Sequence, residues 1–84
     1  MARLVSMAVV KLFAQLREMV GRGEVRVEAS TVDDAVWAVA TEAGEAFKAL
    51  IPHCRIWLDG EPCSGSDPVG ADSEIAILPP VSGG

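Results

Sequence analysis

The residues best suited to chemistry are the last six of the chain, Pro-Pro-Val-Ser-Gly-Gly (79–84). The carboxylate of Gly84 has no Cβ beside it, and Gly83 can adopt dihedral angles that are closed to other residues. Pro79 and Pro80 fix φ at about −65° and favour an extended exit. The pattern predicts a carboxylate that is delivered, on a stiff and narrow tail about 20 Å long, into the catalytic pocket of another protein.

The other residues with reactive side chains do not form a site in the sequence. Cys54 and Cys63 fit no metal-ligand or CxxC spacing, so we expect reduced, structural thiols. His53 stands alone beside Pro52 and is expected in a surface loop. The sequence offers no nucleophile–base pair and no glycine-rich phosphate loop. We therefore expect a domain that binds no metal and no cofactor of its own and is non-catalytic alone.

Composition and charge exclude several classes of protein. The chain has 84 residues, of which 50% are hydrophobic and 23% charged, as in one small globular domain. Its formal net charge of −5 argues against nucleic acid binding, which needs a basic surface. No apolar run is long enough to span a membrane, and Lys11 interrupts the one run that could serve as a signal peptide. We expect a cytoplasmic protein.

Alternating and β-branched residues predict the strands that must position the tail. Residues 1–6 carry little pattern and are predicted to form a flexible extension. After a strand that ends in Leu58, Asp59-Gly60 predicts a two-residue turn, and Pro62 confines the short return strand to an edge of the sheet. The predicted strands are 7–13, 24–29, 54–58 with its return to 63, and 73–78.

Helical spacing predicts one main helix and shorter ones. Residues 30–44 begin with a capping Ser30 or Thr31 and end at Gly44. The stripe expected to face the sheet is Val32, Val36, Val39, Ala40 and Ala43, with Trp37 packing at its rim. A short helix is predicted at 14–21, and residues 45–52 extend or restart the main helix until Pro52 ends it.

The order of these elements predicts an α+β fold of the ubiquitin-like β-grasp type, a mixed sheet packed against one main helix. The last strand is expected beside the first, near the middle of the sheet. A ferredoxin-like sandwich is the alternative, but it needs a second full helix, and the loop at 64–72 cannot supply one. The predicted division is an extension (1–6), a β-grasp domain (7–78) and a tail (79–84).

Three stretches together resemble the small subunit of molybdopterin synthase, a sulfur carrier with a C-terminal Gly-Gly. They are KLFAQLRE (11–18), an acidic loop before EIAILPPV, and the terminal PPVSGG. The similarity covers residues 7–84. The turn LDGEP (58–62) and the loop GADSE (70–74) depart from the family's usual residues but keep turn-forming chemistry.

The resemblance implies a function for the tail. An E1-like adenylyltransferase would use ATP to adenylate Gly84, and a sulfur donor would convert it to a thiocarboxylate. The synthase's large subunit, in a heterotetramer, would use that sulfur on cyclic pyranopterin monophosphate. The residues implied in partner contacts are Phe13, Pro62, Leu78, Pro79, Pro80, Val81 and Ser82, with Arg17 and Glu18 toward the activating enzyme.

Three alternatives remain open at the level of sequence. The chain could carry sulfur for thiamine or cysteine biosynthesis, since those carriers share the fold and the terminal Gly-Gly. It could be a ubiquitin-like modifier that is joined through Gly84 to lysines. It could also be a plain interaction domain whose tail has no chemical role.

Overall fold

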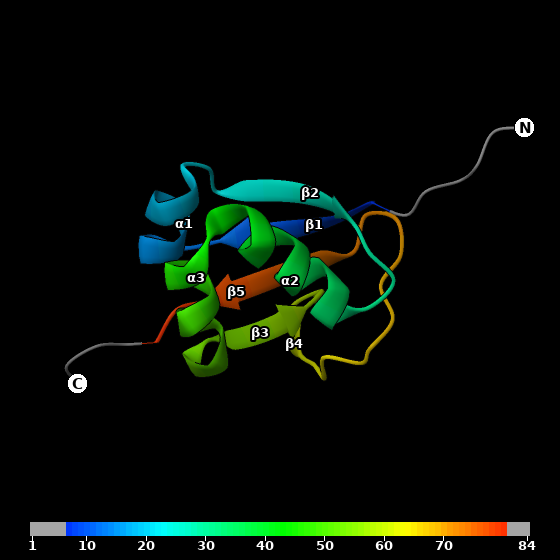
Figure 1. The fold of residues 1–84 in the computed structure, drawn as a ribbon. Coiled ribbons are helices and arrows are strands. Elements are labelled where there is room, and N and C mark those ends of the chain that lie inside the picture. Colours follow the sequence, from blue (N-terminus) through cyan, green and yellow to red (C-terminus); the bar gives the residue numbers. More distant parts are fainter. Residues whose placement is uncertain (1–6, 81–84) are drawn as a thin grey trace, which may run out of the picture.

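The computed structural model describes residues 7–80 as a mixed five-stranded sheet with helices on one face (Figure 1). The predicted extension (1–6) and the last four tail residues (81–84) lie outside the described residues. The strands are β1 (Met7–Leu12), β2 (Glu24–Glu28), β3 (Arg55–Leu58), β4 (Glu61–Pro62) and β5 (Glu74–Leu78). Their order in the sheet is β2-β1-β5-β3-β4.

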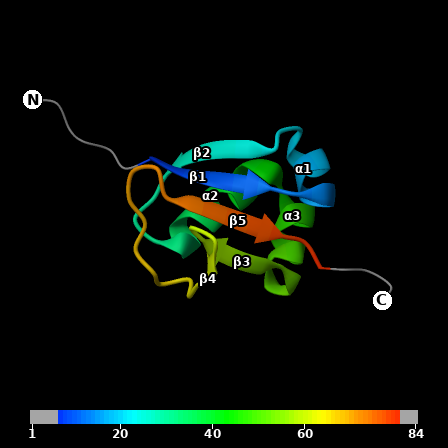
Figure 2. The same ribbon diagram turned by 180° about the vertical axis from the view of Figure 1, so that it is seen from behind.

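The first and last strands form the centre of the sheet. β1 and β5 run parallel, and the other three pairs are antiparallel. Seen from behind, the face of the sheet opposite the helices is open (Figure 2). This topology, with its mixed sheet and helices on one face, is the predicted ubiquitin-like β-grasp.

The main helix, α2 (Val32–Ala43), begins and ends as its sequence predicts. Thr31 is the N-cap, since its side chain accepts a hydrogen bond from the amide of Asp34 at 3.2 Å. Gly44 follows the last turn with a φ of 106°. The predicted stripe lies against the sheet, with Ala43 half-buried and the other four members buried; Ala35 belongs to it as well.

The structure decides one helical prediction and corrects another. Residues 45–52, expected to extend or restart the main helix, restart it as a separate helix, α3 (Glu45–Leu50), because the backbone of Gly44 breaks the helical path. Pro52 was predicted to end this helix, but α3 already ends at Leu50. Pro52 lies inside a 3-10 turn, η1 (Ile51–His53), near its start, where a backbone N–H donor is not needed. Phe47 of α3 is fully buried and is the largest such side chain in the core.

The predicted first strand is one residue too long. β1 ends at Leu12, and Phe13 is the N-cap of α1 (Ala14–Val20), which stops at Gly21 with a φ of 85°, as predicted. The strand that follows buries Val25 and Val27 and exposes its charged residues. Strands with one apolar face therefore enclose a single core between sheet and helices.

The turn and loop on the other side of the core also follow local chemistry. Asp59 and Gly60 both have positive φ, at 50° and 83°, as a type I′ turn requires. The loop after β4 contains no helix and packs over the start of α2. There the carbonyls of Gly65 and Asp67 accept hydrogen bonds from the amides of Asp33 and Val32. These bonds satisfy donors that the first turn of α2 leaves free.

Candidate functional site

The tail leaves the domain from its central region. Residues 78–80, called the tail root below, follow Ile77, which is fully buried and pairs with Leu12 of β1. Leu78 and Pro79 are half-buried and Pro80 is exposed. β5 bonds to a neighbour on each side, so the point at which the tail emerges is fixed by two ladders.

A shallow pocket surrounds the tail root. His53 and Arg55 line it together with Leu78, Pro79 and Pro80. Arg55 lies there because it pairs with Leu78 across the β3–β5 ladder. In the ribbon, the tail root emerges at the end of the molecule that also carries α1 and α3 (Figure 1). A partner that receives the tail would therefore meet an imidazole, a guanidinium and two prolines at its entrance.

The predicted contact residues do not all lie at this end. Phe13 follows Leu12, so it continues β1 beside the tail root, and it is 42% exposed. Arg17 is exposed on α1, and the Cδ and Nε atoms of its side chain lie close to Gly23. Pro62 lies on the outer strand β4, opposite Trp57 and two strands away from β5. The structure thus brings Phe13 to the tail root and leaves Pro62 at an edge of the sheet.

Sequence reasoning missed His53 and Arg55 as neighbours of the tail root. The alternation of Arg55-Ile56-Trp57-Leu58 does contain a signal, because Ile56 and Leu58 pair with the buried Ile77 and Ile75. Arg55 must then lie on the open face, with Leu78. Only the β3–β5 register shows that Arg55 is directly opposite Leu78 and so beside the tail root.

Both cysteines are free thiols held by backbone carbonyls. The Cys54 thiol donates to the carbonyl of Leu50 at 3.2 Å, and that of Cys63 to the carbonyl of Ile56 at 3.5 Å. Burial raises the pKa of both thiols, and the carboxylates of Asp67 and Asp33 raise the pKa of Cys63 further. A raised pKa keeps a thiol protonated, so neither residue is poised as a nucleophile. Residues 7–80 contain no group of three side chains placed to hold a metal ion.

None of the helices within residues 7–80 combines the length and the hydropathy that crossing a membrane requires.

Comparison with known proteins assigns the family. Residues 10–84, which include the whole tail, match the family model described as "ThiS family". The chain belongs to the ThiS family. Its fold and relatives make it a ubiquitin-like sulfur carrier or modifier, as the sequence predicts at that level.

Relatives within the family include archaeal modifiers. The chain is 35% identical to small archaeal modifier protein 1 of Haloferax volcanii, over 88% of this chain and 97% of that protein. Its structure superposes on the crystal structure of that modifier with a TM-score of 0.81 and 32% identity, covering 93% and 99% of the two chains. The solution structure of the Methanosarcina acetivorans modifier gives 0.85 and 27%, covering 98% and 100%.

A complex of subunits 1 and 2 of the molybdopterin-converting factor from Helicobacter pylori also contains this fold. The TM-score is 0.67 with 24% identity, and the match covers 93% of this chain and 99% of that one. At this identity the likeness is one of fold.

Proposed function

We propose that this chain is the sulfur-carrying small subunit of a molybdopterin synthase, with the Gly84 carboxylate as the group that carries sulfur. The observation that carries the proposal is the family match through Gly84, on a tail that leaves the centre of the sheet. The stretches KLFAQLRE and PPVSGG, near opposite ends of the chain, favour the molybdopterin pathway within the family. Synthesis of this cofactor would take place in the cytoplasm.

The chemistry begins with activation, because a carboxylate is a poor acyl donor. An E1-like adenylyltransferase would join the Gly84 carboxylate to the AMP part of ATP and release pyrophosphate. A sulfur donor then displaces AMP and leaves a thiocarboxylate. In the large subunit that sulfur passes to cyclic pyranopterin monophosphate, and the chain returns to its carboxylate form. Two such carriers supply the two sulfurs of the dithiolene.

The described residues support a division of labour. The thiols of Cys54 and Cys63 are engaged and carry raised pKa values, so sulfur is better carried by the terminal carboxylate. The domain would contribute the tail, its exit point and a docking surface around Phe13 and Leu78, while the partners would contribute the catalytic groups. Arg17, exposed on α1, would meet the activating enzyme.

The length of the tail sets the depth of the partner's active centre. Pro80 is the last described residue, and Gly84 is the fourth residue after it. An extended segment of that length spans about 13–14 Å. The acyl carbon would therefore reach a centre that lies roughly that far below the surface that meets the tail root.

Intact-mass measurement tests the proposal. The chain is incubated with the adenylyltransferase of the same organism, ATP and a sulfur donor, and should gain the mass difference between sulfur and oxygen. Gly84→Ala keeps the fold but places a methyl group at the reacting carbon, so we expect at least a tenfold slower gain. Gly70→Ala, the same replacement in the loop before β5, where a Cβ meets nothing within 4 Å, is the matched control and should react like the wild type. No mass gain in the wild-type chain would refute the carrier proposal.

A second measurement decides the pathway. The thiocarboxylate form, mixed with the large subunit and the pyranopterin precursor, should yield molybdopterin. A thiocarboxylate that forms but yields none would assign the chain to another sulfur pathway, such as thiamine or cysteine biosynthesis.

The second candidate function is protein modification, favoured by the 35% identity to small archaeal modifier protein 1. In that case Gly84 would form an amide with a lysine of a target protein. Ladders of conjugates in cells that express the tagged chain, lost with Gly84→Ala, would support this candidate.

A further inference from the structure

Among the described residues, the outer edge of β2 is a free strand edge. β2 is the last strand on its side of the sheet, and within residues 7–80 it pairs only with β1. The amide of Leu12 donates to the carbonyl of Gly23 at 2.9 Å, and the two residues are directly opposite in the register. Because bonded pairs alternate along an antiparallel ladder, Val25 and Val27 direct their backbone groups toward β1. The N–H and C=O groups of Glu24, Arg26 and Glu28 therefore point outward.

The opposite edge of the sheet does not offer the same opportunity. β4 has only two residues, Glu61 and Pro62, and Pro62 has no N–H to donate. β2 has five residues, no proline and alternating burial, so it retains the flat, regular edge that an added strand requires. The fold therefore protects one edge and leaves the other available.

The charge pattern of β2 selects what can pair with it. Its exposed side chains are Glu24, Arg26 and Glu28, which read acid, base, acid in either direction; Glu24 also lies 3.7 Å from the ammonium of Lys11 on β1, and 49% of its side chain stays exposed. A second copy of β2 paired antiparallel about Arg26 would place Glu against Glu at both ends and Arg against Arg at the centre. Like charges directly opposite destabilise a strand pair, whereas opposite charges stabilise it. Self-pairing in this register is disfavoured, and a base–acid–base strand is favoured.

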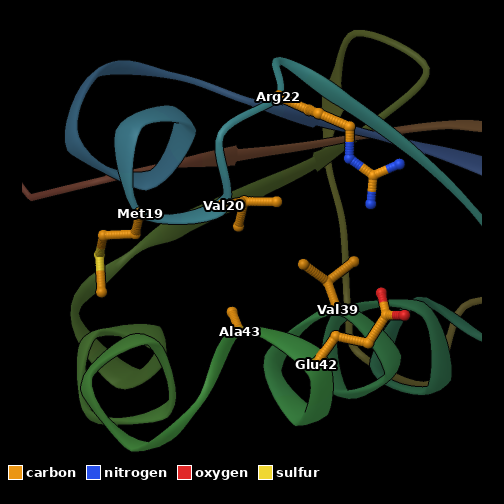
Figure 3. A pocket seen from close by; sticks show the side chains of 6 residues that line it. All are labelled: Met19, Val20, Arg22, Val39, Glu42 and Ala43. Atoms are coloured by element: carbon orange, nitrogen blue, oxygen red, sulfur yellow. The ribbon is translucent and has the colours of Figure 1, made fainter.

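A shallow hollow lies on the helix side of this edge, where the chain enters β2. Figure 3 shows its lining, with Arg22 from the segment before β2 and Val39, Glu42 and Ala43 from α2. Met19 and Val20 at the end of α1 complete it. A strand added along β2 and continuing past Glu24 would direct its helix-side residues toward this hollow. Apolar side chains at those positions would cover the half-buried Val20 and the exposed Met19.

We propose that the outer edge of β2 binds an extended segment of a partner protein in which basic, acidic and basic side chains alternate with apolar ones. The partner adds a sixth strand, by the main-chain hydrogen bonding that defines strand addition. This surface lies two strands away from β5 and the tail root. A bound partner would leave the tail free, so the interaction is separate from the sulfur chemistry of Gly84.

The test is an NMR titration with blocked peptides at low salt, where exposed charges are least screened. The matched peptide is Lys-Val-Glu-Val-Lys, and the mismatched one is Glu-Val-Arg-Val-Glu, the sequence of β2 itself. We expect amide shifts centred on Glu24, Arg26 and Glu28. In the mismatched peptide, the residues opposite Glu24, Arg26 and Glu28 carry the same sign of charge as these residues instead of the opposite sign. It should therefore bind about tenfold more weakly, or worse, than the matched peptide.

Two variants of Arg26 separate edge binding from general charge attraction. Arg26→Pro removes an outward N–H that makes no bond to β1, so the sheet is retained while peptide binding falls at least tenfold. Arg26→Glu should transfer the preference to Lys-Val-Lys-Val-Lys. Arg55→Glu, an equal change of charge on β3, is the matched control and should keep the wild-type preference.

Several results would overturn the proposal, and none depends on thiocarboxylate formation. They are equal affinity for both peptides, shifts centred away from β2, and an unchanged preference in Arg26→Glu. The absence of any shift at millimolar peptide would overturn it as well.

Discussion

At the junction of β1 and α1, Ala14 adopts a φ of 49°, in the left-handed region where glycine is at ease. The geometry is imposed by its neighbours. Phe13 is still extended, and its carbonyl accepts hydrogen bonds from the amides of Leu16 at 3.0 Å and Arg17 at 3.4 Å. Ala14 must reverse the chain within one residue, so its Cβ is held in a conformation that costs about 1–2 kcal/mol.

Replacement of Ala14 by glycine is therefore expected to raise the free energy of unfolding by about 1 kcal/mol, because the strain at Cβ disappears. Urea denaturation measures the change. The matched control is Ala46→Gly in α3, another exposed alanine, where glycine should lower stability by about 0.5–1 kcal/mol. A loss of stability in both variants would contradict the left-handed assignment.

The thiol of Cys63 is held protonated by its surroundings. Burial raises its pKa first, and the negative charges of Asp67 and then Asp33 raise it further. In a Cys54→Ser background, the rate of alkylation follows the thiolate of Cys63 alone. Asp67→Asn removes one repulsive charge but keeps an oxygen that can accept from the Ser64 amide. The pKa of Cys63 should therefore fall in this variant, and the pH of half-maximal alkylation should shift downward.

Asp72→Asn provides the control for this experiment. It makes the same change in charge at a residue that does not contribute to the raised pKa of Cys63. The alkylation profile should then stay where it is. Equal shifts in both variants would mean that net charge, and not the position of Asp67, sets the pKa of Cys63.

At the scale of elements, the β3–β4 turn is fixed to the start of β5 by one residue. The amide of Asp59 donates to the carbonyl of Glu74 at 2.8 Å, and its side chain accepts from the Glu74 amide at 2.9 Å. Asp59 also has a φ of 50°, which Asp and Asn tolerate better than other residues. The turn therefore aligns β3 with β5, and with it Arg55 beside the tail root.

Asp59→Ala should lower the free energy of unfolding by about 1–2 kcal/mol, since it removes one hydrogen bond and leaves a Cβ at positive φ. Asp59→Asn keeps both the acceptor and the tolerated backbone and should stay within about 0.5 kcal/mol of the wild type. Thermal or urea unfolding of the two variants gives the comparison. An Asn variant as unstable as the Ala variant would show that the carboxylate charge, not the turn geometry, is what matters.

The sequence predicts a helix or strand well when residues within that element determine its structure. The alternation of β2 and the cap and stripe of α2 are local signals, and both elements are confirmed. α3 buries one large side chain, Phe47, and whether it extends α2 or restarts after it depends on the φ of Gly44, which helix propensity does not reveal. Pro52 was misjudged because a proline near the start of a 3-10 turn is tolerated.

The same distinction applies to the candidate site. The tail could be recognised from residue types alone, because prolines and glycines restrict or free the backbone by themselves. The neighbours of the tail root could not, since His53 and Arg55 reach it through the pairing of β3 with β5. The distance between Pro62 and the tail root likewise depends on the order of the strands, which residue types do not give.

At the scale of the whole molecule, the charges are unevenly placed. The chain has 12 acidic residues, all within the described part. Eight lie at the end of the sheet where β5 begins, together with the β3–β4 turn and the start of α2 (Figure 1). They are Glu28, Asp33, Asp34, Asp59, Glu61, Asp67, Asp72 and Glu74. The end with the tail root holds the other four, with most of the basic residues, so self-repulsion is concentrated far from the tail.

This distribution predicts a stability effect that depends on position. Glu61→Lys and Glu18→Lys both change the net charge from −5 to −3, at exposed residues of β4 and α1. Glu61 lies in the acidic end, so its reversal should stabilise the fold by about 0.3–0.5 kcal/mol at low salt. Glu18 is next to Arg17 in the sequence and four residues before Arg22, at the end of the molecule that is close to neutral, so its reversal should give no gain or a small loss. Urea unfolding measures both without adding ions.

Salt provides the internal check on this prediction. At about 0.5 M NaCl the screening length falls to a few ångströms, and the difference between the two variants should largely vanish. Equal stabilisation by both variants would indicate uniform repulsion set by net charge alone. A difference that persists in salt would point to a change in packing around Glu61. Only a difference in stability between the two variants that is present at low salt and lost at high salt supports the uneven distribution of charge. In that case, repulsion is concentrated at the acidic end, and the end that presents the tail is close to neutral.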